Sequence, residues 1–320
     1  MLPESGAIAV FLPVAGTDLS VLPKARVQVI QPVFPDHDAF RAAGYTCRVR
    51  AGDTRFAAAL VCLPRAKARA RAVIAQAMEL TDGPVIIDGA KTDGIDGILK
   101  DMRKRGPVSA PLSKAHGKLF WTAAAPAAFA DWHEAPPHPV EGFVTAPGVF
   151  SADGIDPASR LLAEALPAAP GRHLADLGAG WGYLAARLLE RDGIERLDLV
   201  EADHIALDCA RQNVTDPRAQ FHWADATRWA PDRKYDAVVM NPPFHTGRRA
   251  DQGLGRAFIQ AAARLLTPSG QLWMVANRHL GYEAVLKDCF AGVEEIAGDT
   301  RFKVIHATRP ARGAPQRARD

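Results

Sequence analysis

The sequence predicts an α/β protein with two domains, the second of which is a doubly wound parallel sheet. Its 320 residues are about twice the length of a typical domain. After residue 140, short apolar runs alternate with helical repeats, which is typical of strands and helices in a parallel sheet. Hydrophobic residues make up 48% of the chain and charged residues 23%, a balance that excludes fibrous and wholly disordered proteins. The net charge of +3 gives no global argument for a nucleic-acid partner.

Apolar periodicity places the strands and helices of the second domain. Leu184 and Leu188 lie one helical turn apart, and Leu254, Phe258 and Leu265 share one face of a later helix. Between these helical stretches, apolar runs predict strands at residues 173–177, 197–201, 220–224, 235–240, 271–276 and 302–307.

The first domain carries a weaker form of the same alternation. We expect strands at 27–33, 57–63 and 85–88 and helices at 65–79 and 94–105. No glycine-rich turn follows these strands, so we expect no cofactor site there. Because the segment 133–148 is rich in proline, it predicts a linker. We expect domains at 1–140 and 141–310, followed by a basic, disordered tail at 311–320.

A glycine-rich turn after the first strand of the second domain is the first candidate binding site. Gly178, Gly180 and Gly182 follow Asp176 at alternate positions, and bare backbone lets a ligand approach closely. A glycine turn can also join strand and helix for packing alone. Tyr183 stands where dinucleotide-binding turns need a small residue, and the carboxylate of Asp176 would repel a phosphate. A ligand with a positive amino group and no phosphate, such as S-adenosylmethionine, fits better.

Acidic residues end the next two predicted strands. Glu201 could accept hydrogen bonds from both hydroxyls of a ribose, and Asp225 with Ala226 could contact an adenine edge. Structural alternatives exist, since Asp203 could cap the next helix and Asp225 could serve a turn.

The fourth predicted strand ends in Asn241-Pro242-Pro243-Phe244, at the edge of the sheet where ligands of doubly wound folds bind. Asn-Pro-Pro is often only a turn. Here, however, proline holds Asn241 extended, so the Asn241 side-chain oxygen and the Pro242 carbonyl form two rigid acceptors. They could grip both hydrogens of a planar amine and aim its lone pair at a methyl group, while Phe244 stacks on a base. The catalytic candidates are therefore Asn241, Pro242 and Phe244, and Asn241 also joins the cofactor-binding candidates.

These motifs together resemble class I S-adenosylmethionine-dependent methyltransferases that act on an exocyclic amine. More closely, residues 148–162 (GVFSADGIDPASRLL), 241–247 (NPPFHTG), 275–282 (VANRHLGY) and 300–304 (TRFKV) are similar to bacterial ribosomal RNA guanine-N2 methyltransferases. The resemblance implies a Rossmann-like methyltransferase domain, preceded by a degenerate, cofactor-free copy that takes part in substrate recognition. It also implies methyl transfer to a guanine N2. GVFS and RFKV favour the small-subunit enzyme, whereas VANRHLGY leans toward the large-subunit relative.

Basic residues give weaker candidates for contact with RNA phosphate. They are His245, Arg248 and Arg249 after the Asn-Pro-Pro motif, and Arg103, Lys104 and Arg105 in the first domain. Runs of charge are more often solvated faces, so that alternative stays open.

Other features of the sequence limit the compartment and the partners. The histidines lack metal-ligand spacing, so no metal is expected. Four cysteines without a C-x-x-C motif and the absence of a long apolar stretch indicate a cytoplasmic protein. We expect a monomer whose partner is ribosomal RNA or a ribosomal subunit.

Three other functions remain open from the sequence. The amine could be another one, such as adenine N6 or a protein glutamine amide. The chain could also be a catalytically silent RNA-binding scaffold. An NAD-dependent oxidoreductase is disfavoured by Tyr183 and by the lack of hydride-transfer residues.

Overall fold

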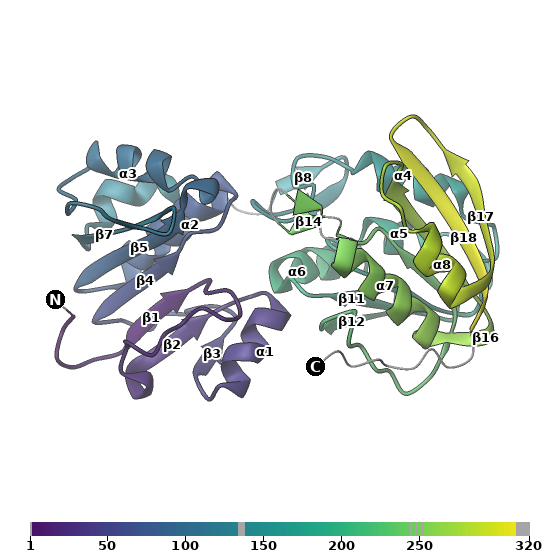
Figure 1. Cartoon of the computed structure of the whole chain (residues 1–320), viewed down its shortest axis with the longest axis horizontal. Helices are drawn as coiled ribbons and strands as arrows, with labels where there is room; N and C mark the ends of the chain where they lie inside the picture. Colours follow the sequence, from purple (N-terminus) through teal and green to yellow (C-terminus); the bar gives the residue numbers. More distant parts are fainter. Residues whose placement is uncertain (1, 134–137, 244, 247–248, 251, 312–320) are drawn as a thin grey trace. The chain divides into compact units, whose positions relative to one another are not determined.

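The structure is a computed structural model that describes residues 2–133, 138–243, 245–246, 249–250 and 252–311 (Figure 1). The chain divides into two compact units, Met1–Pro136 and Pro137–Asp320.

The N-terminal unit is a seven-stranded sheet covered by helices. Its strand order is β3-β2-β1-β4-β5-β7-β6, and only β7 runs antiparallel to its neighbours. Helices α2 and α3 pack on one face, and α1 packs on the other. The strands are β1 (Ile8–Phe11), β2 (Val27–Ile30), β3 (Thr46–Arg48), β4 (Ala58–Cys62), β5 (Pro84–Ala90), β6 (Leu112–Lys114) and β7 (Gly117–Ala123). The helices are α1 (Phe34–Ala42), α2 (Lys67–Leu80) and α3 (Ile95–Arg103), with 3-10 turns at Lys24–Arg26, Lys91–Asp93 and Pro126–Trp132.

The C-terminal unit repeats this architecture. Its main sheet has the order β12-β11-β10-β13-β16-β18-β17, which matches the N-terminal sheet strand for strand. The strands are β10 (His173–Leu177), β11 (Arg196–Glu201), β12 (Ala219–Trp223), β13 (Tyr235–Met240), β16 (Leu266–Asn277), β17 (Phe290–Gly298) and β18 (Phe302–Pro310). Two small hairpins lie outside it, β8 (His138–Val140) with β9 (Phe143–Thr145), and β14 (His245–Thr246) with β15 (Arg249–Ala250).

Helices cover both faces of the second sheet. Helices α4 (Pro157–Ala165), α5 (Tyr183–Leu189) and α6 (His204–Asn213) share one core cluster, whereas α7 (Gln252–Leu265) and α8 (Glu283–Cys289) contribute to another. In Figure 1, α7 and α8 lie side by side on their face of the sheet. Because the central strands are buried on both faces, β13 is apolar at every position except Asp236 near its amino end.

The prediction of a parallel sheet was wrong for one strand, β18. Strand β18 runs antiparallel to both β16 and β17, so the sheet is mixed. The turn between β17 and β18 is short, and a short turn can join only antiparallel neighbours. The apolar patterns of the sequence also do not predict β1, α1 and β17. Only Phe40 of α1 is buried, so its sequence carries little helical periodicity.

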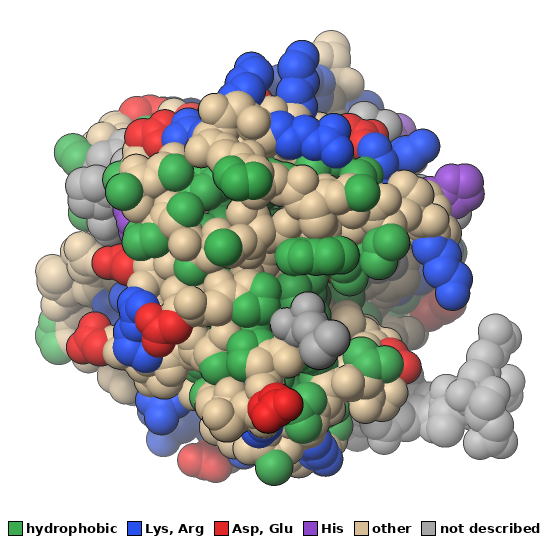
Figure 2. Space-filling view, turned by 90° about the vertical axis from the view of Figure 1, so that its left-hand side faces the viewer, with side chains coloured by type: hydrophobic (Ala, Val, Ile, Leu, Met, Phe, Trp, Pro, Cys, Tyr) green, Lys and Arg blue, Asp and Glu red, His purple; other side chains and the backbone are tan. Residues whose placement is uncertain are grey.

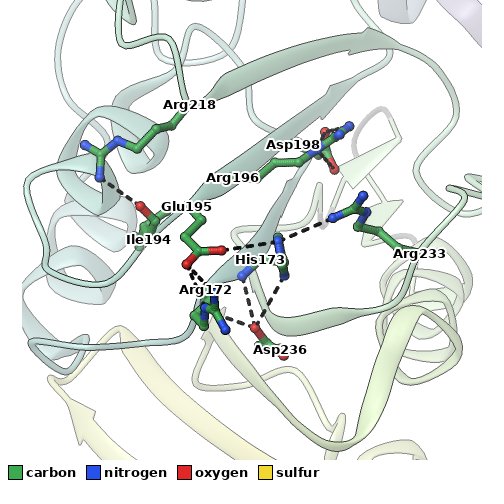
Figure 3. Close-up of polar contacts among 9 residues, drawn as sticks. All are labelled: Arg172, His173, Ile194, Glu195, Arg196, Asp198, Arg218, Arg233 and Asp236. Atoms are coloured by element: carbon green, nitrogen blue, oxygen red, sulfur yellow. Dashed lines mark hydrogen bonds and ion pairs between the residues drawn. The ribbon is translucent and has the colours of Figure 1, made fainter.

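Polar contacts join the amino ends of the central strands (Figure 3). The Asn-Pro-Pro motif follows the carboxyl end of β13. The Asp236 carboxylate accepts the backbone N–H groups of Arg172 and His173 at 3.1 and 3.0 Å. The Arg172 guanidinium pairs with Glu195, which precedes β11. These contacts help to fix how β10, β11 and β13 line up, and thereby where their carboxyl ends lie.

Candidate active site

The predicted site residues lie together at the carboxyl ends of four neighbouring strands of the second sheet. Asp176 lies near the end of β10, Glu201 ends β11, Asp225 follows β12 and Asn241 follows β13. These four parallel strands are neighbours in the order β12-β11-β10-β13. Carboxyl ends of adjacent parallel strands lie together, so the structure places these residues at the same end of the sheet, where ligands of doubly wound folds bind.

The three glycines of the turn after β10 have different surroundings. All three have positive φ, at 77°, 56° and 90° for Gly178, Gly180 and Gly182. A Cβ on Gly180 would meet no atom within 4 Å, as expected of a residue that a ligand approaches. A Cβ on Gly182 would instead meet Ala210 and Val214 at 3.0–3.3 Å. Gly182 therefore allows close packing against α6. At this position the glycine serves packing, which was the alternative to a ligand-binding role.

Glu201 is anchored by the backbone on both carboxylate oxygens. Its Oε2 accepts the N–H of Gly180 at 2.7 Å, and its Oε1 accepts the N–H of Asp203 at 2.8 Å. A carboxylate has about four lone-pair positions, so acceptor capacity remains for ribose hydroxyls. The pKa of Glu201 is raised above its usual value, mainly because the carboxyl group is buried. Asp203 caps α6 by accepting the Ile205 N–H at 3.0 Å, as the structural alternative predicted.

Asp176 is a fully buried acid whose oxygens form no hydrogen bond of good geometry among the described residues, although the Ala185 backbone N–H opposes the rise of its pKa. Burial, and next the nearby charge of Glu201, raise the pKa of Asp176 to about 8. An unpaired buried carboxylate is costly and favours a cationic partner. This carboxylate, the open backbone at Gly180 and the acceptors of Glu201 fit S-adenosylmethionine, which carries an ammonium, a ribose and no phosphate.

Asp225 serves the turn that follows β12. Its Oδ1 accepts both the N–H and the hydroxyl of Thr227, at 2.9 and 2.6 Å. Ala226 beside it is buried. The turn role of Asp225 is thus present in the structure, and its contact with adenine stays a prediction.

The Asn241 side chain is held by two residues that the sequence analysis did not single out. Its Nδ2 donates to Asp156 Oδ2 and to Ser159 Oγ, each at 2.8 Å. Asp156 is the N-cap of α4 and also accepts the Ser159 N–H at 2.8 Å. In the sequence, Asp-Pro before a helix indicates only an N-cap, and the 85 residues between Asp156 and Asn241 conceal the contact. Pro242 is buried, and Phe244 lies outside the described residues.

The basic residues predicted to contact RNA differ in whether they already have partners within the protein. The Arg105 guanidinium binds both oxygens of Asp131, at 2.5 and 2.7 Å, and lies over the Trp132 ring, so it already has a structural role. Arg103 and Lys104 are exposed at the end of α3. On the N-terminal face shown in Figure 2, Lys and Arg side chains gather toward the upper edge. For His245 and Arg249 the structure gives the backbone in β14 and β15, and Arg248 lies outside the described residues.

A mixed sheet of this strand order, with its acidic strand ends and an Asn-Pro-Pro motif at one edge, is the arrangement of class I S-adenosylmethionine-dependent methyltransferases. The model of the methyltransferase small domain family matches residues 141–306. The chain belongs to this family, and the prediction made from its motifs is confirmed.

Curated relatives of two kinds are similar to the chain. Ribosomal RNA large subunit methyltransferase G of Shewanella amazonensis is 31% identical over 242 residues, which cover 72% of this chain and 63% of the relative. Ribosomal RNA small subunit methyltransferase C of Pseudomonas aeruginosa is 31% identical over 287 residues, which cover 86% of this chain and 84% of the relative. The similarity to the large-subunit type therefore spans less than two thirds of that relative's length.

A solved structure shares the fold of the whole chain. The 16S rRNA N2 methyltransferase of T. thermophilus, in complex with AdoMet and guanosine, has a TM-score of 0.79 at 24% identity and covers 97% of this chain and 90% of its own. This likeness confirms the two α/β domains. In the part of the chain that the structure describes, no helix is long and apolar enough to span a membrane.

Proposed function

We propose that this chain transfers a methyl group from S-adenosylmethionine to the exocyclic N2 amine of a guanine in ribosomal RNA. The observation that carries the proposal is the fixed orientation of Asn241 at the end of β13. Because its Nδ2 faces Asp156 and Ser159, its Oδ1 points to the other side as a hydrogen-bond acceptor. The names of the curated relatives support RNA as the substrate class.

Each site residue then has a role in positioning. S-adenosylmethionine supplies an activated methyl group on a sulfonium. Asp176 pairs with its ammonium, Glu201 accepts from its ribose, and Asp225 lies near its adenine. Asn241 Oδ1 and the Pro242 carbonyl accept the two hydrogens of the guanine amine, so that the nitrogen lone pair is aimed at the methyl carbon.

The role proposed for Phe244 rests on the sequence alone, because this residue lies outside the described residues. A flat aromatic ring after the second proline could stack on a flipped guanine, a contact worth roughly 1–3 kcal/mol.

The small ribosomal subunit is the better candidate for the substrate. Relatives of both subunit types have similar identity, but the chain covers 84% of the P. aeruginosa small-subunit relative against 63% of the Shewanella large-subunit relative. A large-subunit guanine N2 is the alternative. The compartment that fits either substrate is the cytoplasm, and nothing in the proposed reaction requires more than a monomer.

We further propose that the N-terminal unit binds RNA and not a cofactor. Gln31 comes directly after Ile30, the partner of the last residue of β1, just as Glu201 comes directly after Val200, the partner of the last residue of β10. The Gln31 Oε1 accepts the Val33 N–H at 3.0 Å, as Glu201 accepts from Asp203. Its Nε2 donates to the Pro13 carbonyl at 2.8 Å, so a neutral amide fills this position. After β4 the chain continues as Leu-Pro-Arg, without an asparagine.

The Asn241→Ala variant tests the catalytic assignment. Because Asn241 acts on the amine, kcat should fall by roughly 10²-fold or more while cofactor affinity changes little. The rate should be measured with labelled S-adenosylmethionine on small and large subunits from a strain that lacks the gene, with the modified nucleoside identified by mass spectrometry. An equal loss of cofactor affinity would contradict the role of Asn241. A methyl group on adenine N6 or on protein would contradict the substrate.

A further inference from the structure

We propose that Asp156 and Ser159, at the start of α4, are positioning residues that set the orientation of the Asn241 amide for catalysis. This inference rests on the proposed function, because it concerns how the same amine is held. The juxtaposition that carries it is a pair of acceptors on α4, each 2.8 Å from Asn241 Nδ2.

The chemistry of these acceptors fixes which end of the amide faces α4. A carboxylate can only accept hydrogen bonds, so the amide end that faces Asp156 must be the –NH₂ group. Ser159 Oγ accepts the second hydrogen of the same group. Both N–H bonds of Asn241 are thereby used, and the carbonyl oxygen is left on the side away from α4. A rotated amide would instead present two donors to the substrate amine, which is also a donor.

The start of α4 is itself held rigidly. Asp156 is its N-cap, Pro157 occupies the first helical position, and Asp156 Oδ2 accepts the Ser159 N–H at 2.8 Å. Ser159 is buried, and Ala158, Leu162 and Ala163 of the same helix belong to the core cluster that contains Val239 of β13. The two acceptors are therefore fixed relative to the strand that carries Asn241.

The contact can be separated from the helix cap by the choice of substitution. In Asp156→Ser the shorter side chain can still cap α4 but does not reach Asn241, whereas Asp156→Asn keeps an acceptor of the same length. Glu141→Gln is the matched control, since Glu141 accepts the Ile155 N–H at 3.2 Å and pairs with Arg160 beside the same helix start but does not contact Asn241.

We expect Asp156→Ser to lower kcat by roughly 10- to 100-fold, with cofactor affinity and melting temperature close to those of the unaltered chain. Asp156→Asn should retain most of the activity, and Glu141→Gln should retain it fully. Unchanged kcat in Asp156→Ser would overturn the proposal. A fall in kcat matched by an equal loss of cofactor affinity or of stability would overturn it too, as would an equal fall in Glu141→Gln.

A spectroscopic measurement tests the orientation without any substrate. The two side-chain N–H signals of Asn241 can be assigned in ¹H–¹⁵N spectra by their absence from Asn241→Ala. They should shift strongly in Asp156→Ser and little in Glu141→Gln. Unshifted signals in Asp156→Ser would refute the contact. If no variant methylated ribosomal RNA, the proposed function would fail, but these signals would still decide whether Asp156 orients Asn241.

Discussion

Asp176 shows how a single residue can oppose stability and serve binding. It is fully buried, and its carboxylate forms no hydrogen bond of good geometry in the described part of the chain. Its pKa of about 8 means that the cofactor-free protein carries it protonated at neutral pH. A cationic ligand group beside it would favour the charged form, so binding of S-adenosylmethionine should release a proton near pH 7.

The Asp176→Asn variant tests this on stability. A raised pKa in the folded state means that the stabilisation by this group is complete below pH 3.8 and is lost as the pH rises through about 8. Because the loss begins at the unfolded pKa of 3.8, the cofactor-free Asn variant should melt at a higher temperature than the unaltered chain by a margin that is small near pH 4 and grows up to about pH 8. It should also bind S-adenosylmethionine more weakly, as measured by calorimetry. A difference in melting temperature that did not grow with pH would contradict the assignment.

At the scale of elements, α7 packs closely against the residue that precedes α8 on the same face of the second sheet. Gly255 of α7 packs against the buried Tyr282 ring, and a Cβ at this position would overlap the phenol. Gly255→Ala should therefore destabilise the chain by about 1–3 kcal/mol despite the better helix propensity of alanine.

Denaturant unfolding measures this effect, and a glycine in α3 provides the control. A Cβ on Gly97 would meet no atom within 4 Å, so Gly97→Ala should be neutral or stabilise by up to about 1 kcal/mol. If both variants gained stability alike, the packing of Tyr282 against α7 would not limit the size of residue 255.

At the scale of the whole molecule, two units of the same strand order differ in the residues at their strand ends. The C-terminal unit keeps Asp176, Glu201 and Asn241 at its strand ends, whereas Gln31 occupies the matching position of Glu201 in the N-terminal unit. This difference supports the proposal that the C-terminal unit carries out the reaction and the N-terminal unit recognises the substrate.

Charge reversal on α3 tests the recognition role in the full chain. Because Lys100, Arg103 and Lys104 are exposed, replacing each with Glu should raise KM for ribosomal subunits and reduce its dependence on salt, with cofactor affinity unchanged. Arg41→Glu is the control, since α1 lies on the opposite face of the same sheet. A KM equal to that of the unaltered chain would place RNA binding elsewhere.

The sequence by itself determined the strands of the second sheet other than β17, and the residues at the carboxyl ends of β10, β11, β12 and β13. Predicted strands at 173–177 and 235–240 have the same bounds as β10 and β13, because strands buried on both faces are mostly apolar and stand out from their surroundings. The glycine-rich turn and the Asn-Pro-Pro motif each consist of residues close together in the sequence, so they can be recognised without coordinates. The family prediction followed from them.

Only the tertiary structure decided which groups complete the site. The reversal of β18, the packing role of Gly182 and the contact of Asp156 with Asn241 all join residues far apart in the sequence. Hydrogen bonds and close packing act over a few ångströms in space and leave no periodic pattern along the chain. A capping aspartate at position 156 therefore looks ordinary until α4 is packed beside the end of β13.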